Sequence, residues 1–386
     1  MRNTWLLKPG ELTLKGENRK SFEGILKSNI KRLLAPVDNN IEYKFTAGRY
    51  YIIAPEDKSA EIECILSRLP GISGWARTIT CEKKSGAIFA ACIEEGKKLY
   101  NQGVTTFKIE ARRTDKSFPL NSYELRCKAG DAVADAVSGL TVNIPNPGEI
   151  IRIEIREKAL VYSGGSKGIG GLPVGTAGKG LLLLSGGIDS PVAGFLMAAR
   201  GMIIEAAHFH AYPYTSREAR RKVINLSRIT GGYCMGIRLY LINFAEVQSR
   251  IKKGAPFSWN TVLLRMAMME AAEKTALKIK CKAIITGESL SQVASQTIEN
   301  LTCAQSGISL PVLRPLIGFS KEDIIAKAKM IGTYQTSIEP YQDCCALFSP
   351  PHPVLRGRSE EARALYETLD LEPLIDEALK DREIIK

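Results

Sequence analysis

The stretch LLLLSGGIDSPVAGFLMAARG at residues 181–201 most constrains what this chain can fold into. Four consecutive leucines are typical of a strand buried on both faces, as in a parallel sheet. A short glycine-bearing turn follows, and then Pro191, which is favoured at the first helical position, with Ser190 before it as the expected N-cap. Gly201 is expected to end the helix. Strand, tight turn and helix in this order predict a doubly wound α/β domain.

The turn itself predicts a phosphate site. In doubly wound sheets, ligands bind beyond the carboxyl ends of the strands. The backbone N–H groups of Ser185, Gly186 and Gly187 lie before a helix N-terminus, where they attract an anion, and glycine lets a phosphate come close. The turn has neither the lysine of a P-loop nor a G-x-G-x-x-G pattern. The alternative, a tight turn without a ligand, leaves the grouping of Ser, Gly, Gly, Asp and Ser unexplained.

Patterning along the rest of the chain predicts further units. Residues 1–58 form a small α+β unit, with a helix at 17–35 and a strand–turn–strand at 41–55. Residues 59–165 alternate between helices and strands, and 166–175 is a glycine-rich linker. Residues 176–386 repeat strand and helix, with expected strands at 181–185, 203–210, 236–244 and 283–287. The fold class is therefore multidomain α/β.

The amino-acid composition indicates where the protein is located in the cell and which class of partner it binds. No run of 18 apolar residues and no signal-peptide core is present, so we expect no membrane span and a cytoplasmic location. The nine cysteines are an odd, scattered set, which favours free thiols in a reducing compartment. The net charge is +12, of which +8 falls in residues 1–180. That excess indicates a nucleic acid partner, with an ordinary solvated surface as the alternative.

The order S-G-G-x-D-S at 185–190 resembles the PP-loop of ATP pyrophosphatases. Those enzymes cleave ATP between the α- and β-phosphates and adenylate a carbonyl oxygen of the substrate. The resemblance implies that the turn holds the pyrophosphate that is released. Asp189 would repel bare phosphate, so we expect it to ligate Mg²⁺, which also neutralises the leaving group.

More of the chain resembles one PP-loop family, the tRNA 4-thiouridine synthetases, or ThiI-type sulfurtransferases. The resemblance rests on GELTLKGENRKSF at 10–22, TFKIEARRTDKSFPLNSYEL at 106–125, GGLPVGTAGKGLLLLSGGIDSPVAG at 170–194, TGESLSQVASQT at 286–297 and RPLIGFSKEDI at 314–324. It implies an N-terminal ferredoxin-like domain, a THUMP domain that binds the tRNA acceptor end, and a C-terminal PP-loop domain. It also implies ATP as cofactor, tRNA uridine 8 as substrate and a homodimer.

The turn and the resemblance together give a set of candidate ATP contacts. Strand-end backbone and one arginine fork are suited to hold adenine, ribose and phosphate. The expected contacts are Leu183, Leu184, Ser185, Gly186, Gly187, Ser190, His208, Phe209, Arg265, Gly287 and Gln296. His208 and His210 face the same way on a strand, yet no third metal ligand has suitable spacing, so nucleotide contact or packing is favoured over a metal pair.

Lys321 is a further candidate. Ser320 is the expected N-cap of a helix, with Asp323 at the capping-box position, so Lys321 falls in the first turn. A cation there gains nothing from the helix dipole. The resemblance implies that Lys321 assists adenylation or contacts phosphate, and a solvated lysine is the alternative.

Sulfur chemistry is predicted at PYQDCCALFSPPHP, residues 340–353, where prolines indicate a loop. The resemblance makes Cys344 the persulfide carrier, and Cys345 either a resolving thiol or a bystander. Longer family members carry the persulfide on a rhodanese domain, which this sequence does not show, so a cysteine desulfurase is the expected donor. No C-x-x-C pair occurs, which disfavours an iron–sulfur cluster, although Cys234, Cys281 and Cys303 stay open as ligands.

RNA binding is expected in residues 1–165, through basic side chains that contact phosphates. The candidates are Lys15, Arg19, Lys20, Arg112, Arg113 and Lys116. Three other functions stay open: sulfur transfer for the thiazole of thiamine, an RNA-binding module with a non-catalytic nucleotide site, and a PP-loop amide synthetase.

Overall fold

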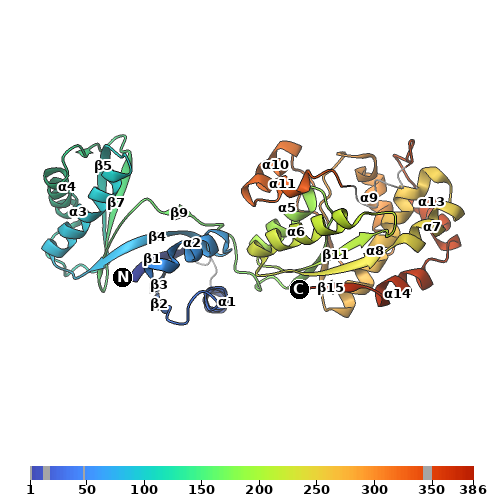
Figure 1. Cartoon of the computed structure of the whole chain (residues 1–386), viewed down its shortest axis with the longest axis horizontal. Coiled ribbons are helices and arrows are strands. Elements are labelled where there is room, and N and C mark those ends of the chain that lie inside the picture. Colours follow the sequence, from blue (N-terminus) through green and yellow to red (C-terminus); the bar gives the residue numbers. More distant parts are fainter. Residues whose placement is uncertain (1, 12–17, 47, 342–349) are drawn as a thin grey trace. The chain divides into compact units, whose positions relative to one another are not determined.

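The computed structural model describes residues 2–11, 18–46, 48–341 and 350–386 (Figure 1). The chain divides into two compact units, Met1–Leu172 and Pro173–Lys386. Within the described ranges, no helix is long and apolar enough to cross a membrane.

The first unit begins with an antiparallel half-sheet in the order β2-β3-β1-β4. Helix α1 turns Leu26, Ile30 and Leu34 inward at four-residue spacing, which is why this segment is an amphipathic helix. The predicted helix and hairpin are confirmed, whereas β1 was not foreseen. The elements are β1 (Arg2–Pro9), α1 (Arg19–Leu34), β2 (Glu42–Thr46), β3 (Arg49–Pro55), α2 (Ser59–Arg68) and β4 (Ile72–Cys81).

The same sheet continues through β4 into the order β8-β7-β5-β6. One end of β4 pairs with β1 and the other with β8, so a single strand serves both halves. A capping box at Asn121 and Glu124 starts α4. The elements are α3 (Ser85–Asn101), β5 (Thr106–Arg113), α4 (Ser122–Ala136), β6 (Thr141–Val142), β7 (Glu149–Ile155), β8 (Ala159–Ser163) and β9 (Ser166–Lys167).

The glycine-rich stretch after residue 163 is partly ordered against this sheet. Strand β9 pairs with β4, and the Gly170 carbonyl accepts a 2.8 Å hydrogen bond from Gly71 N. Gly170 and Gly171 have positive φ angles, which only glycine adopts at low cost. The domain boundaries drawn from the sequence stay predictions.

The second unit is a six-stranded sheet in the order β14-β13-β10-β11-β12-β15. All neighbours are parallel except β12 and β15, which confirms the doubly wound class. The strands are β10 (Lys179–Leu183), β11 (Ile203–His210), β12 (Arg238–Asn243), β13 (Ala283–Ile285), β14 (Val312–Leu313) and β15 (Glu383–Ile385). The helices are α5 (Asp189–Ala199), α6 (Arg217–Cys234), α7 (Ala245–Gly254), α8 (Asn260–Lys278), α9 (Ile298–Ala304), α10 (Lys321–Met330), α11 (Tyr334–Ser337), α13 (Ser359–Thr368) and α14 (Glu372–Lys380).

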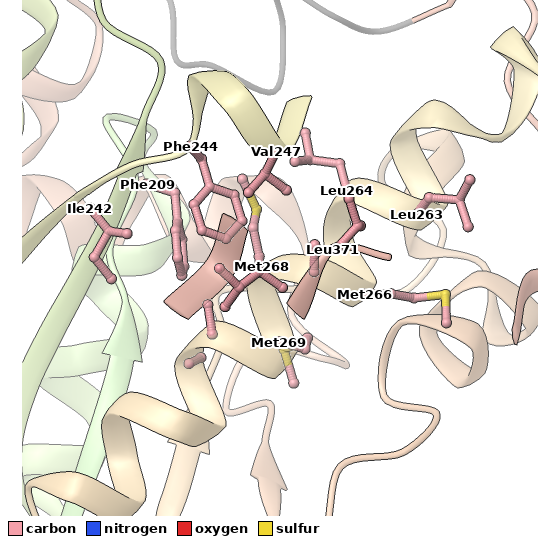
Figure 2. Close-up of a cluster of buried hydrophobic side chains, with 14 of the residues drawn as sticks. Phe209, Ile242, Phe244, Val247, Leu263, Leu264, Met266, Met268, Met269 and Leu371 are labelled. Atoms are coloured by element: carbon pink, nitrogen blue, oxygen red, sulfur yellow. The ribbon is translucent and has the colours of Figure 1, made fainter. Parts of the chain in front are cut away.

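Helices cover both faces of this sheet (Figure 1). Helices α5 and α6 pack on one face, and Gly194 of α5 lets Leu182 approach so closely that a Cβ would lie 2.7 Å from its Cδ2. Helix α8 packs on the other face, where Phe209 and Phe244 have ring centroids 4.6 Å apart. Figure 2 shows both rings in one cluster with Met268 and Met269 of α8. This apolar core packs against the sheet and so supports the carboxyl ends of its strands.

Candidate active site

The turn after β10 is closed by its own serines. Ser190 Oγ accepts a 2.9 Å hydrogen bond from Ser185 N and lies 3.0 Å from Ser185 Oγ. Helix α5 already begins at Asp189, and the cap position is Ile188, which makes no side-chain cap. The prediction of Ser190 as N-cap was therefore wrong, because its hydroxyl closes the turn behind it instead of bonding N–H groups ahead.

Two glycines of the site have different physical reasons. A Cβ on Gly187 would meet only Ser185 Oγ, at 3.4 Å, so the protein's own packing leaves room for a methyl group. A Cβ on Gly287 would lie 2.7 Å from Ser190 N and 2.8 Å from its Cα. Gly287 is thus needed for the segment after β13 to approach α5, whereas packing does not explain Gly187.

A cavity of about 210 Å³ lies at this carboxyl edge. It brings together eight of the predicted residues from four separate segments, namely Leu183, Ser185, Gly187, Asp189, Ser190, Arg265, Gly287 and Gln296. Sequence reasoning missed Met268, Met269, Thr286 and Glu288. The sequence spacing could have predicted all four. The methionines follow Arg265 by three and four positions and so share its face of the helix, and the other two residues flank Gly287.

Four of the predicted ATP contacts do not line this cavity. Phe209 points into the apolar cluster against α8 (Figure 2). The Leu184 carbonyl accepts a 2.9 Å hydrogen bond from His208 Nδ1, so the imidazole supports the strand end behind the turn. Gly186 lies in the turn between two residues that line the cavity, but it does not line the cavity itself. Their carried-over nucleotide contacts stay predictions.

Lys321 reaches the cavity through an ion pair. Its Nζ lies 2.7 Å from Asp189 Oδ1, and Gln292 Nε2 donates to Asp189 Oδ2 at 2.9 Å. Ser320 caps α10 as predicted, by accepting a hydrogen bond from Asp323 N. The first turn of α10 therefore points its cation at the first turn of α5. This explains a lysine at a helix end where the dipole does not favour it.

A buried carboxylate organises the other side of the cavity. Glu288 is 4% exposed and forms ion pairs with Arg265 and with Arg314, whose Nε lies 2.6 Å from its Oε2. Thr286 Oγ1 donates to the same oxygen at 2.8 Å. Two guanidiniums against one carboxylate leave a net positive charge at the cavity wall. Burial lowers the pKa of Arg314 from its ordinary value.

Replacing Glu288 by glutamine should destabilise the protein and weaken its affinity for ATP. The change leaves two half-buried guanidiniums without a counter-charge, which is expected to lower the free energy of unfolding by about 3 kcal/mol. Urea unfolding and an ATP titration measure the two effects. Glu322→Gln, at an exposed position of α10, is the matched control. Unchanged stability in Glu288→Gln would contradict the stabilising role assigned to the clamp, the ion pairs of Glu288 with Arg265 and Arg314.

Among the described residues, the two histidines of β11 are not joined by a third side chain suited to bind a metal. Their rings are 6.4 Å apart and nearly parallel. No group of three His, Cys, Asp or Glu suited to a metal ion occurs in the part of the chain that the structure describes. Burial first, and then the charges of His208 and Arg220, lowers the pKa of His210 to about 4. His210 is therefore neutral near pH 7.

The depressed pKa of His210 predicts acid sensitivity. The unfolded imidazole titrates at its ordinary value of 6.5, so the unfolded state binds this proton more readily than the native state below that pH. The free energy of unfolding should fall as the pH drops from about 6.5 to 4, and His210→Gln should reduce this slope. Urea unfolding at several pH values measures it. His352→Gln, at an exposed position, is the control, and an equal slope in wild type and His210→Gln would refute the assignment.

The predicted RNA-binding residues lie in the first unit, except Lys15, which is outside the described residues. Arg19 and Lys20 open α1, where Arg19 pairs with Glu23 at 2.8 Å. Arg112 and Lys116 are exposed, whereas Arg113 Nη1 donates to the Phe118 carbonyl and so also supports its own loop. A cavity of about 730 Å³ in this unit adds four basic side chains that were not foreseen: Lys44, Lys83, Arg156 and Lys158.

Cys344 and Cys345 lie outside the described residues. The thiols of Cys234, Cys281 and Cys303 are buried, and burial raises the pKa of Cys281 to about 12. These three do not form a cluster suited to a metal among the described residues.

Comparison with known families gives matches along nearly the whole chain. Residues 4–76 match the ThiI ferredoxin-like domain, 82–163 match the THUMP domain, and 175–371 match the family described as thiamine biosynthesis protein (ThiI). The three matched ranges follow one another without overlap.

Comparison with individual relatives supports the same family assignment. A probable tRNA sulfurtransferase of Treponema pallidum is 44% identical over 98% of this chain and 94% of the relative. Another, from Caldanaerobacter subterraneus, is 44% identical over 97% and 98%. A crystal structure of a 4-thiouridine synthetase–RNA complex with bound ATP superposes with a TM-score of 0.91 at 34% identity, covering 100% and 99% of the two chains. The chain belongs to the ThiI family, with its ferredoxin-like and THUMP domains.

Proposed function

We propose that this protein is an ATP-dependent tRNA sulfurtransferase that converts a uridine, at position 8, to 4-thiouridine. The observation that carries the proposal is the cavity lined by the S-G-G-x-D-S turn and Arg265, where Lys321 pairs with Asp189 of the lining. Full-length relatives named probable tRNA sulfurtransferases support the substrate, and the ATP complex of a 4-thiouridine synthetase supports the cofactor.

In the adenylation step, the turn and the start of α5 bind the β- and γ-phosphates through backbone N–H groups. In this proposal Arg265, which pairs with Glu288, contacts a phosphate, and Lys321, which pairs with Asp189, stabilises the negative charge that develops as pyrophosphate leaves. O4 of the uridine attacks the α-phosphorus, and the bond to pyrophosphate breaks. The base then carries AMP as its leaving group.

Asp189 fits a role in Mg²⁺ binding. Of the two carboxylates that line the cavity among the described residues, Glu288 is held by two guanidiniums, whereas Asp189 bonds an ammonium and an amide. Mg²⁺ in such sites takes few protein ligands and mainly phosphate oxygens. When bound, it would neutralise charge on the leaving pyrophosphate. Lys321 and Gln292 fix the orientation of this carboxylate, because each donates a hydrogen bond to one of its two oxygens.

For the sulfur step we propose a persulfide on Cys344, loaded by a cysteine desulfurase. Its terminal sulfur attacks C4 of the adenylated base and expels AMP, which leaves the base joined to Cys344 through a disulfide. A second thiol, Cys345 in our proposal, attacks the sulfur of Cys344 and releases 4-thiouridine as the thiolate. The two cysteines end as a disulfide, so an external dithiol must reduce them before the next turnover.

The basic side chains of the first unit support tRNA binding there. Exposed Lys20, Arg112 and Lys116, with the four basic residues of the larger cavity, provide the positive surface that RNA phosphates require. The homodimer, which the resemblance implied, and the cytoplasmic location, which the composition indicated, stay proposals.

The test is a reconstituted reaction with tRNA, ATP and Mg²⁺, in which 4-thiouridine is followed by its near-ultraviolet absorbance. Sulfide is the donor in one series, and a cysteine desulfurase with cysteine in the other. Cys344→Ser should lose only the desulfurase-driven reaction, and Cys127→Ser, at an exposed thiol of the first unit, should lose neither. Pyrophosphate release without 4-thiouridine under every condition would refute the substrate.

A second function is favoured by the description of the family match, which names thiamine biosynthesis. The same persulfide would then also supply sulfur for a thiazole ring. Desulfurase-driven sulfur transfer in the absence of tRNA is the observation that would separate the two activities.

A further inference from the structure

The segment between β11 and α6 lies beside the candidate phosphate site. Strand β11 pairs with β10, and Leu184 N, at the start of the S-G-G-x-D-S turn, donates to the Ala207 carbonyl. Residues 211–216 follow the carboxyl end of β11 directly. Because neighbouring strands are about 4.8 Å apart, this segment and the turn share one edge of the sheet.

Two large aromatic side chains are exposed there. Tyr212 is 54% exposed and Tyr214 is 64% exposed. The segment that carries them is held at both ends, because Thr215 N donates to the Ala211 carbonyl at 2.9 Å and Asn243 Nδ2 donates to the Tyr212 carbonyl at 3.3 Å. Both rings are more than half exposed on a turn that these hydrogen bonds fix, so their apolar surface is open to solvent.

Positive charge continues from this turn into α6. Arg217 and Arg221 are exposed in its first turns, one helical turn apart, and Glu218 is the acidic residue of the first turn. The third arginine, Arg220, pairs with Glu383 of β15. The helix dipole disfavours cations at this end, so their position favours an anionic partner.

The proposed reaction requires an unstacked base at this edge. An enzyme that acts on a base must take it out of the stack to reach the target atom. Proteins hold unstacked RNA bases by stacking them on aromatic rings and by binding the adjoining phosphates through arginine or lysine. The turn at 211–216 and the start of α6 provide both groups beside the place where ATP would react.

We propose that Tyr212 and Tyr214 form the stacking surface for unpaired RNA bases at the target uridine, and that Arg217 and Arg221 bind the phosphates of the same strand. This inference rests on the proposed function and extends it. It gives the second unit an RNA-binding surface of its own, next to the cavity.

Enzyme kinetics are the first test. The double variant Tyr212→Ala/Tyr214→Ala should lower kcat/KM for tRNA by about 10- to 100-fold, the loss expected for one or more stacked bases. Its affinity for ATP without RNA should not change. Tyr212→Phe/Tyr214→Phe should restore most of the activity, because stacking needs the ring and not the hydroxyl. Ile203→Ala, 42% exposed at the opposite end of β11, is the matched control.

The role of the two arginines is tested separately, through the salt dependence of KM for tRNA. Arg217→Gln/Arg221→Gln should raise KM for tRNA and lower the slope of log KM against log salt by about 0.7 for each phosphate contact. An unchanged salt slope would remove the arginines from the proposal.

Photocrosslinking locates the base directly. The probe is tRNA that already contains 4-thiouridine at position 8, which is photoreactive under near-ultraviolet light. Wild-type crosslinks should map to the tryptic peptide 201–217, and the alanine double variant should lose them. Crosslinks confined to other peptides, or wild-type kinetics in the alanine variant, would overturn the inference. If the wild type forms no 4-thiouridine yet crosslinks at 201–217, the proposed function fails while the binding surface stands.

Discussion

Replacing Lys321 by methionine should lower tRNA-dependent pyrophosphate release by about 100- to 1,000-fold, the loss typical of removing one fixed donor to a developing charge. In the structure, Lys321 Nζ lies 2.7 Å from Asp189 Oδ1, at the N-terminus of the helix that follows the phosphate turn. In the proposed mechanism, the lysine is therefore beside the place where charge accumulates on the leaving pyrophosphate. Methionine keeps the length of the side chain and removes the charge.

The fold should survive this change. The Lys321 side chain is 40% exposed, and ion pairs of that kind contribute less than about 1 kcal/mol to stability. Thermal unfolding should therefore match wild type. Lys327→Met, on the same helix, is the control for loss of positive charge. A Lys321→Met variant with normal pyrophosphate release would show that the ion pair is only structural.

Asp189→Asn tests the partner in the same assay. If Asp189 helps to hold Mg²⁺, this variant should need a higher Mg²⁺ concentration for half-maximal rate, whereas Lys321→Met should not. An equal Mg²⁺ requirement in both variants would indicate that the carboxylate acts only by positioning the lysine.

The second large effect concerns Gly187, where alanine should strongly weaken ATP binding without unfolding the protein. A methyl group at this position meets only Ser185 Oγ at 3.4 Å, so the free energy of unfolding should change by less than about 1 kcal/mol. In the complex, the methyl group would push a phosphate away from the backbone N–H groups. The loss of one charge-assisted hydrogen bond corresponds to about 10- to 100-fold weaker binding.

Gly287→Ala should behave differently, because its methyl group would lie 2.7 Å from the backbone nitrogen of Ser190. Backbone must move, so we expect a loss of about 1–3 kcal/mol in stability together with weaker ATP binding. Gly318→Ala, with no atom within 4 Å, is the control for both variants. Urea unfolding and ATP titration separate them. If Gly187→Ala bound ATP normally, the phosphate role of the turn would be refuted.

The sequence determined those features that depend on neighbours along the chain. Strand β11 spans residues 203–210, as its apolar run predicted, and α5 follows β10 where the glycine turn indicated. Both patterns are local, because alternation and helical spacing report burial within one element. The S-G-G-x-D-S turn was recognised in the same way, since all its polar residues fall within six positions, and its phosphate role stays a prediction.

Only the tertiary structure decided which distant residues meet. Lys321 and Asp189 are 132 positions apart, and the clamp of Arg265, Glu288 and Arg314 joins three segments. The edge strands β14 and β15 were not foreseen for the same reason: two or three residues carry no pattern, and their pairing with β13 and β12 defines them. Ser190 fits an N-cap locally, yet its hydroxyl bonds Ser185 because the turn folds back on it. Local pattern fixes which element forms, whereas the partner of each polar side chain depends on which segments the sheet brings to one edge.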